Sequence, residues 1–194
     1  IDAVLAIRTE NDLRGDDVAR VDLEVFQGAY DFAGGGAYGD KDHPLTKEQA
    51  DYNLKFLSAV ALLDGGVGPE QLETERVLRS DVQDLLARVD VKPVADLTAD
   101  YPRRTAARVH VVTRDGREFR REQADYEGSP TRPMCWERVV DKFHWLAEPF
   151  CDEALRADII AAVDHLDEIP VADLAGLLGT VSSTARRPRS QPRF

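Results

Sequence analysis

The stretch LTKEQADYNLKFLSAVALLDGG, residues 45–66, decides the fold of this chain. Thr46 and Gln49 have the spacing of a capping box, in which a hydroxyl and an amide satisfy backbone donors at a helix start. Apolar residues then recur at helical spacing, and by Ser58 the segment is apolar on nearly every side, as in a buried helix. The two glycines at its end supply the left-handed exit that ends many helices. We therefore expect one central buried helix near 46–64.

The segments around this helix predict short strands and further helices. Alternation of apolar and polar residues predicts strands at 21–25 and 89–91 and a hairpin over 107–126, with a turn at Asp115-Gly116. Helical spacing recurs over 2–10, 80–89, 136–147, 153–166 and 171–178. Because strands and helices do not alternate as in βαβ folds, we expect an α+β class, with a small antiparallel sheet packed with about five or six helices.

The composition describes a folded and acidic protein. Hydrophobic residues make up 43% of the chain, and 25 basic against 36 acidic residues give a net charge of −11. A body of this charge repels phosphate backbones, so we expect no nucleic-acid partner. Residues 182–194 hold four arginines and no acid. Their low complexity predicts a basic, disordered tail beyond a domain over 1–181.

Other features limit the class of protein. The longest apolar run, Phe56–Leu63, is far shorter than the about 20 residues that a membrane span needs, so we expect no membrane partner. No secretory signal pattern opens the chain. Cys135 and Cys151 lack CxxC spacing, fit a reducing cytoplasm and are expected to be buried thiols. The four histidines lack ligand spacing, so we expect no metal.

The loop before the central helix, GGGAYGDKDHP at 34–44, is the most unusual loop in the chain. Its glycines match neither a dinucleotide fingerprint nor a phosphate-binding loop, so we expect no nucleotide cofactor. The chain itself opens as IDAVLAIRTEN, inside a helical pattern and without an initiator methionine or a cap. This opening indicates sequence that has been removed upstream or lies on another chain. On the hairpin, His110 falls on the polar face and is expected to be solvated.

Two groups of residues carry a resemblance to a known family. The first group is HPLT at 43–46, ADYNLKF at 50–56 and AVALLDGG at 59–66. The second is DG at 115–116, YEGSPTRPM at 126–134 and KF at 142–143. In this order and spacing the chain, from Ile1 to about Val181, resembles the C-terminal domain of the MmgE/PrpD family. That family includes 2-methylcitrate dehydratases, cis-aconitate decarboxylases and iminodisuccinate epimerases.

The resemblance implies the smaller, α+β domain of a two-domain enzyme, with the active site in the cleft beside a large helical domain. That helical domain would lie on a missing N-terminal part or on a separate subunit. Substrates would be small di- or tricarboxylic acids, from which a proton is removed beside a carboxylate. The expected protein is a cytoplasmic, cofactor-independent lyase or isomerase, of the 2-methylcitrate dehydratase kind, assembled as a homo-oligomer such as a homodimer.

The resemblance also implies where a catalytic group lies. One active-site position of the family, a tyrosine six residues before the proline that starts the central helix, corresponds here to Tyr38 before Pro44. Its phenol would donate a proton or a hydrogen bond to substrate, or else the ring only holds the glycine-rich loop. Lys41 and His43 share this loop and are candidate substrate-binding residues, with solvated surface as the alternative. Lys142 is expected to make a structural hydrogen bond or ion pair.

Two features of the sequence bear on which reaction the resemblance implies. Residues 51–53 read Asp-Tyr-Asn, where decarboxylase-like members resemble Arg-His-Ser, which disfavours cis-aconitate decarboxylation in particular. The family's Lys and His pair before the first helix of the small domain would fall upstream of Ile1. The chain therefore lacks a complete acid–base set. The alternative function is a non-catalytic binding or assembly module that keeps the fold without the chemistry.

Overall fold

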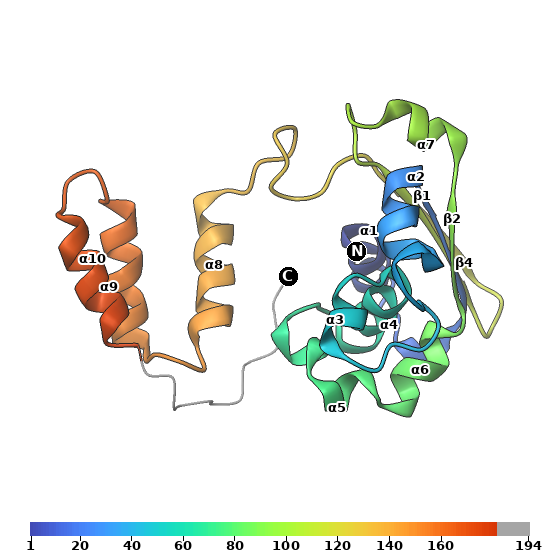
Figure 1. Cartoon of the computed structure of the whole chain (residues 1–194), viewed down its shortest axis with the longest axis horizontal. Helices are drawn as coiled ribbons and strands as arrows, with labels where there is room; N and C mark the ends of the chain where they lie inside the picture. The colour runs from blue at the N-terminus through green and yellow to red at the C-terminus, as the bar shows by residue number, and fades with distance from the viewer. Residues whose placement is uncertain (182–194) are drawn as a thin grey trace. The chain divides into compact units, whose positions relative to one another are not determined.

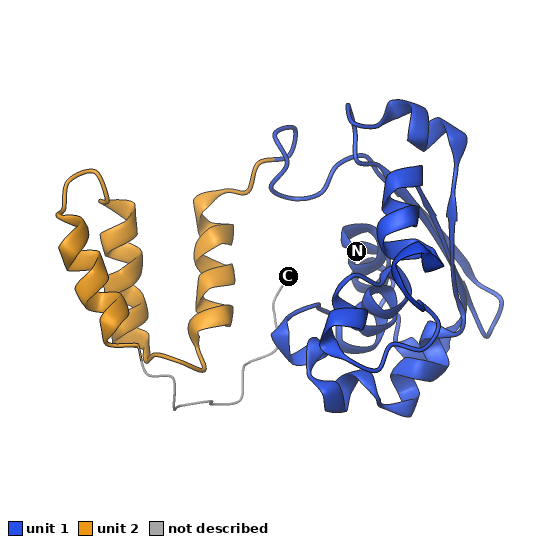
Figure 2. Ribbon diagram, viewed as in Figure 1, with its two compact units in different colours: residues 1–132 blue, residues 133–194 orange. Residues whose placement is uncertain are grey.

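The computed structural model describes residues 1–181, which form two compact units (Figure 2). Unit 1 is Ile1–Arg132, and unit 2 begins at Pro133. The predicted basic tail at 182–194 lies outside the described residues. Unit 1 contains the sheet and the glycine-rich loop. The described secondary structure of unit 2 consists of helices. Among the helices of 1–181, none combines the length and the apolarity that crossing a lipid bilayer requires.

Unit 1 is built on a four-stranded sheet in the order β2-β1-β3-β4. The strands are β1 (Val18–Val25), β2 (Val89–Pro93), β3 (Ala107–Thr113) and β4 (Glu118–Gln123). β1 pairs parallel with β2 and antiparallel with β3, and β3 pairs antiparallel with β4. The sheet is therefore mixed rather than antiparallel as expected, because a long helical crossover returns the chain to the side of β1 in the same direction.

The helices complete the α+β class that the sequence predicts. They are α1 (Asp2–Glu10), α2 (Gln27–Ala29), α3 (Lys47–Asp51), α4 (Leu54–Asp64), α5 (Thr74–Val77), α6 (Ser80–Leu86), α7 (Ala95–Asp100), α8 (Trp136–Ala147), α9 (Glu153–Asp164) and α10 (Val171–Gly179). α1 contacts β3 and β4, and α4 contacts β2, α1 and α6 (Figure 1). The core of unit 1 lies between these helices and the apolar face of the sheet.

The predicted central helix is two helices. α3 and α4 are separated at Tyr52 and Asn53, so the expectation of one helix near 46–64 is corrected. Asn53 is fully buried, and its Oδ1 accepts hydrogen bonds from the amides of Lys55 (3.0 Å) and Phe56 (3.1 Å). This is N-cap geometry, and it starts a new helix inside a continuous helical pattern. α4 is buried as expected and ends at Gly65, whose φ of 76° is left-handed.

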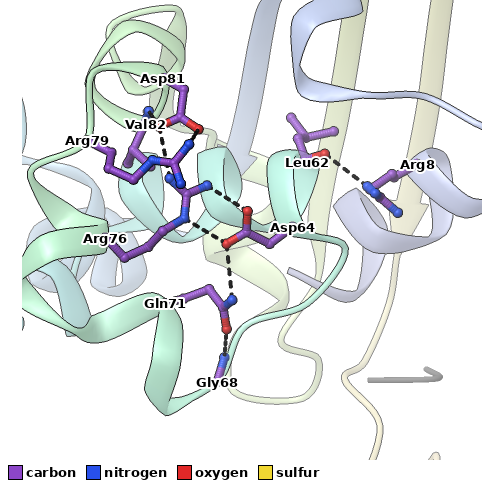
Figure 3. Close-up of polar contacts among 9 residues, drawn as sticks. All are labelled: Arg8, Leu62, Asp64, Gly68, Gln71, Arg76, Arg79, Asp81 and Val82. Atoms are coloured by element: carbon purple, nitrogen blue, oxygen red, sulfur yellow. Dashed lines mark hydrogen bonds and ion pairs between the residues drawn. The ribbon is translucent and has the colours of Figure 1, made fainter. Parts of the chain in front are cut away.

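A cluster of polar side chains closes the C-terminal end of α4, and Figure 3 shows its contacts. Arg76 donates to Asp64 through Nε (3.0 Å, Oδ2) and Nη2 (2.6 Å, Oδ1) and to Asp81 Oδ1 through Nη1 (2.9 Å). Gln71 Nε2 donates to Asp64 Oδ2 at 3.1 Å. We call these four residues the Arg76 cluster. Bidentate contacts of this kind hold geometry firmly, so the cluster joins α4 to α5 and α6.

Charged side chains cover the face of the sheet opposite the core. One row crosses all four strands in register with alternating charge: Lys92, Glu24, Arg108 and Glu122. Arg108 Nε lies 2.7 Å from Glu122, and Lys92 Nζ lies 3.2 Å from Glu24. This face is thus held by neighbouring opposite charges, a favourable arrangement of cross-strand pairs.

His110 lies in the next row of this charged face. Its ring nitrogens lie 3.2 Å from Asp22 Oδ2 and 3.0 Å from Glu118 Oε2. The side chain is only 15% exposed, so the expectation of a solvated histidine is wrong. The strand register places Asp22 directly opposite His110 on β1, and Glu118 lies diagonally from it on β4, two residues before its partner Arg120.

Unit 2 leaves much of its apolar surface uncovered. α9 packs against α10 and α8, yet the large apolar residues that remain exposed include Trp136, Val139, Leu166, Val171 and Leu178. Large exposed apolar surface is typical of a contact region. The expectation of two buried thiols is also wrong. Cys135, the residue immediately before α8, is exposed, and Cys151, in the turn after α8, is half-buried.

Candidate functional site

The glycine-rich loop leads from β1 and α2 to α3. At two positions of this loop the structure requires glycine. A Cβ on Gly34 would lie 2.6 Å from Cγ1 of Val91 in β2, so only glycine permits this approach. Gly39 has a φ of 105°, a conformation that side chains rarely adopt. Between them, Gly36–Tyr38 form one short 3-10 turn that carries the candidate tyrosine. The glycines therefore shape the loop against the sheet.

Reciprocal hydrogen bonds hold this loop to the break between α3 and α4. Lys41 Nζ donates to the carbonyl oxygen of Tyr52 at 2.8 Å. Asn53 Nδ2 donates back to the carbonyl oxygen of Lys41 at 3.0 Å. An ion pair between Lys55 Nζ and Asp42 Oδ1 at 2.6 Å adds a third contact. The helix break therefore serves two purposes, because the cap of α4 also fixes the loop.

Three aromatic side chains lie exposed above this junction, and we call them the aromatic cluster: Phe32, Tyr38 and Tyr52. The ring of Phe32 meets Tyr38 edge-on, with centroids 5.8 Å apart, and Tyr52 in the same manner at 5.0 Å. Edge-to-face contacts at these distances favour a defined ring arrangement. Tyr38 nevertheless stays 70% exposed. The cluster thus presents an ordered phenol at the surface of unit 1.

The three candidate site residues differ in burial and in their contacts. Lys41 is only 7% exposed, and burial lowers the pKa of its amine. It lies inside the loop, where it contacts Tyr52, and not on the surface as a substrate-binding lysine would. His43 is exposed, with Nδ1 3.3 Å from Asp40 Oδ2. Hydrogen bonds from the Asp42 amide and from His43 hold the pKa of Asp40 below its ordinary value.

Tyr38 and His43 are consequently the candidates that lie exposed on the loop, whereas Lys41 is buried and supports the loop from beneath. The assignment of Tyr38 to catalysis and of Lys41 and His43 to substrate binding stays a prediction. Lys142 lies exposed on α8 in unit 2. Within residues 1–181, no three His, Cys, Asp or Glu side chains gather as metal ligands would.

Sequence reasoning missed Asn53 and Phe32 as parts of this site. Asn53 had a usable signal, because an asparagine inside a helical pattern competes for backbone hydrogen bonds and favours caps. Phe32 had none, since its contacts with the two tyrosines depend on how the loop turns back over the helix. Chemically, the arrangement offers a phenol as a hydrogen-bond or proton donor. A complete elimination also requires a base.

Comparison with known proteins identifies a matching family and two similar proteins. The family model of the MmgE/PrpD C-terminal domain matches residues 1–168. Cis-aconitate decarboxylase of Homo sapiens and that of Mus musculus are each 20% identical to this chain over 132 residues. The aligned stretch covers 68% of this chain and 27% of each relative. The chain therefore spans about a quarter of the length of these relatives.

Proposed function

This chain belongs to the MmgE/PrpD family as a C-terminal domain, and from that premise we propose that it is the small domain or subunit of a lyase or isomerase. The substrate is a small di- or tricarboxylic acid, and the specific reaction proposed is a cofactor-independent dehydration of the 2-methylcitrate kind. The observation that carries the proposal is the exposed phenol of Tyr38, on a loop that Asn53 and Lys41 hold against α4.

In this proposal Tyr38 acts as the proton donor or as a hydrogen-bond donor to a substrate carboxylate. Elimination of water leaves a departing oxygen that must be protonated, and an exposed phenol is suited to that task. The base and the cations that hold the carboxylates are assigned to a helical domain, on a preceding part of the chain or on a separate subunit. A single positioned acid contributes a factor of about 10² to 10⁴ in rate.

The exposed apolar surfaces support a partner for this domain. The rings of the aromatic cluster are apolar groups that a docked helical domain would cover. The exposed apolar side chains of unit 2 are further groups that a partner would cover. Contiguous exposed apolar groups commonly mark protein contacts. We place the active site at the contact between unit 1 and the helical domain, in a cytoplasmic homo-oligomer.

The test compares two phenols of the same cluster in the intact protein. Tyr38→Phe and Tyr52→Phe each remove one hydroxyl and keep the ring contacts with Phe32. We expect Tyr38→Phe to lower kcat by about 10² or more and Tyr52→Phe to change it by less than about threefold. The assay follows the alkene product of citrate-like acids by ultraviolet absorbance. Equal turnover in the wild type and Tyr38→Phe would remove Tyr38 from the mechanism.

One observation favours a second candidate function, a non-catalytic binding or assembly module. Of the three candidate residues, Lys41 is buried and bonded within the loop, which leaves two of them, Tyr38 and His43, exposed to a ligand. The same screen separates the two functions. An intact protein that binds citrate-like acids in equilibrium dialysis, yet turns none of them over, is the module and not the enzyme.

A further inference from the structure

Phe32 is the member of the aromatic cluster that both tyrosines contact. Its ring centroid lies 5.8 Å from that of Tyr38 and 5.0 Å from that of Tyr52, with interplanar angles of 61° and 82°. Rings in this edge-to-face arrangement restrict one another's orientation. A phenylalanine side chain carries no titratable group, so its contribution to a reaction is to position its neighbours.

The backbone that carries Phe32 is fixed at both ends. Phe32 lies in the middle of one π-helical turn from Tyr30 to Gly34, which the amide of Gly35 closes by donating to the carbonyl oxygen of Tyr30 at 2.6 Å. Tyr30 packs against the core, and Gly34 lies in close contact with Val91 of β2. Turns of this kind are rare and are frequent at functional sites. The turn therefore anchors Phe32 on unit 1, although its side chain stays 51% exposed.

The backbone that carries Tyr38 is held less firmly. Its 3-10 turn is closed by a long hydrogen bond of 3.3 Å, from the amide of Gly39 to the carbonyl oxygen of Gly36. A Cβ added to either of these glycines would meet no atom within 4 Å, so open space surrounds the turn. Glycines also give a segment more conformational freedom than other residues do. The edge contact with Phe32 is therefore what gives the ring of Tyr38 a defined orientation.

We propose that Phe32 is a positioning residue for Tyr38: the π-helical turn fixes Phe32 on unit 1, and its ring holds the phenol of Tyr38 in the orientation that donates to substrate. This inference rests on the function proposed above and states how the donor group is held. An edge-to-face pair changes the population of a held orientation by about two- to tenfold. Loss of the Phe32 ring should therefore cost less turnover than loss of the Tyr38 hydroxyl.

The first test observes the ring contact directly, by ¹⁹F NMR of the intact protein labelled with 3-fluorotyrosine. Tyr38→Phe and Tyr52→Phe assign two of the five tyrosine resonances. In Phe32→Leu the resonances of Tyr38 and Tyr52 should move, because the neighbouring ring is lost, whereas those of Tyr101 and Tyr126 should stay. Circular dichroism checks that the fold is kept. A Tyr38 resonance that does not move overturns the proposal.

The second test uses turnover of citrate-like acids. We expect Phe32→Leu to lower kcat about five- to tenfold and to change KM by less than about twofold, and Phe32→Tyr, which keeps the ring, to stay within about twofold of wild type. In a Tyr38→Phe background, Phe32→Leu should cause no further loss, because the hydroxyl that it positions is already absent.

The proposal is overturned if Phe32→Leu keeps the wild-type kcat, if it lowers kcat equally in both backgrounds, or if Phe32→Tyr loses as much as Phe32→Leu. The two tests also separate this inference from the function on which it rests. A wild type that turns over no citrate-like acid removes the proposed function, whereas the ¹⁹F resonances decide whether Phe32 orients Tyr38 without any turnover.

Discussion

The two ends of α4 differ in how completely their side chains are paired with other side chains of unit 1. At the C-terminal end, Arg76 is only 14% exposed and meets carboxylates of Asp64 and Asp81. At the N-terminal end, the backbone is capped and bonded by Asn53 and Lys41, but the three rings of the aromatic cluster stay exposed and meet one another by edge contacts. The first end is complete within unit 1, which is what stability requires. The second presents groups that the unit does not use, which is what contact with another molecule requires.

The largest expected effect is the loss of the Arg76 cluster. Arg76→Met leaves the partly buried carboxylate of Asp64 without its cation and leaves Asp81 with the exposed Arg79 alone, so we expect the free energy of unfolding to fall by about 3 kcal/mol. Arg79→Met is the matched control, because Arg79 contacts the same Asp81 but is 64% exposed. It should cost less than about 0.5 kcal/mol. Urea denaturation measures both, and equal losses would show that burial does not set the value of this cluster.

A smaller effect is expected at the other end of α4. Asn53→Ala removes a cap and also the donor to the carbonyl oxygen of Lys41, so we expect a loss of about 2 kcal/mol. Thr46→Ala is the control, since its Oγ1 accepts from the amide of Gln49 at a long 3.4 Å and the residue is exposed. It should cost about 0.5 kcal/mol.

The same variants test whether the cap supports the site. Amide hydrogen exchange in residues 38–43 should become faster in Asn53→Ala and stay unchanged in Thr46→Ala, because the Asn53 side chain donates to the carbonyl oxygen of Lys41 in this loop, whereas the Thr46 side chain accepts from Gln49 in α3. If exchange in the loop stays slow without Asn53, the loop is held by other contacts and the two ends of α4 are less different than they appear in the structure.

The smallest effect concerns pH. Burial lowers the pKa of Lys41 below its ordinary value of 10.5, so the unfolded chain binds more protons than the folded one between the two pKa values. The contribution of this group to stability therefore rises as pH increases through that window. Relative to Lys41→Met, the wild type should gain unfolding free energy as pH approaches 10.5.

Local features of the fold were predictable because local residues determine them. The strand alternation at Val21–Val25 and the turn at Asp115-Gly116 appear where the sequence placed them. The parallel pairing of β1 with β2 was not predictable, since the two strands are far apart in the sequence. The residue pattern of a strand does not specify which strand it pairs with. The helix break at Asn53 was missed because the apolar spacing continues across it, whereas the cap acts through one side chain.

The candidate site shows the same division. Tyr38 was identified through the family resemblance and lies exposed on the loop, but its neighbour Phe32 depends on tertiary contacts. Lys41 was expected to bind substrate or to lie on the solvated surface, yet its carbonyl oxygen and its amine bond to Asn53 and Tyr52 at the break between α3 and α4. The surroundings of His110 likewise required the register of β1 and β3, which no local pattern specifies.

The charged face of the sheet has a consequence for solubility. β4 is an edge strand, and an open edge can recruit a strand from another molecule and start aggregation. Every second residue of β4 on this face is charged, at Glu118, Arg120 and Glu122. An incoming strand would have to match that order of signs, which most sequences do not. Replacing these three by threonine would keep strand propensity and leave the edge unprotected, so we expect visible precipitation on heating before any loss of secondary structure.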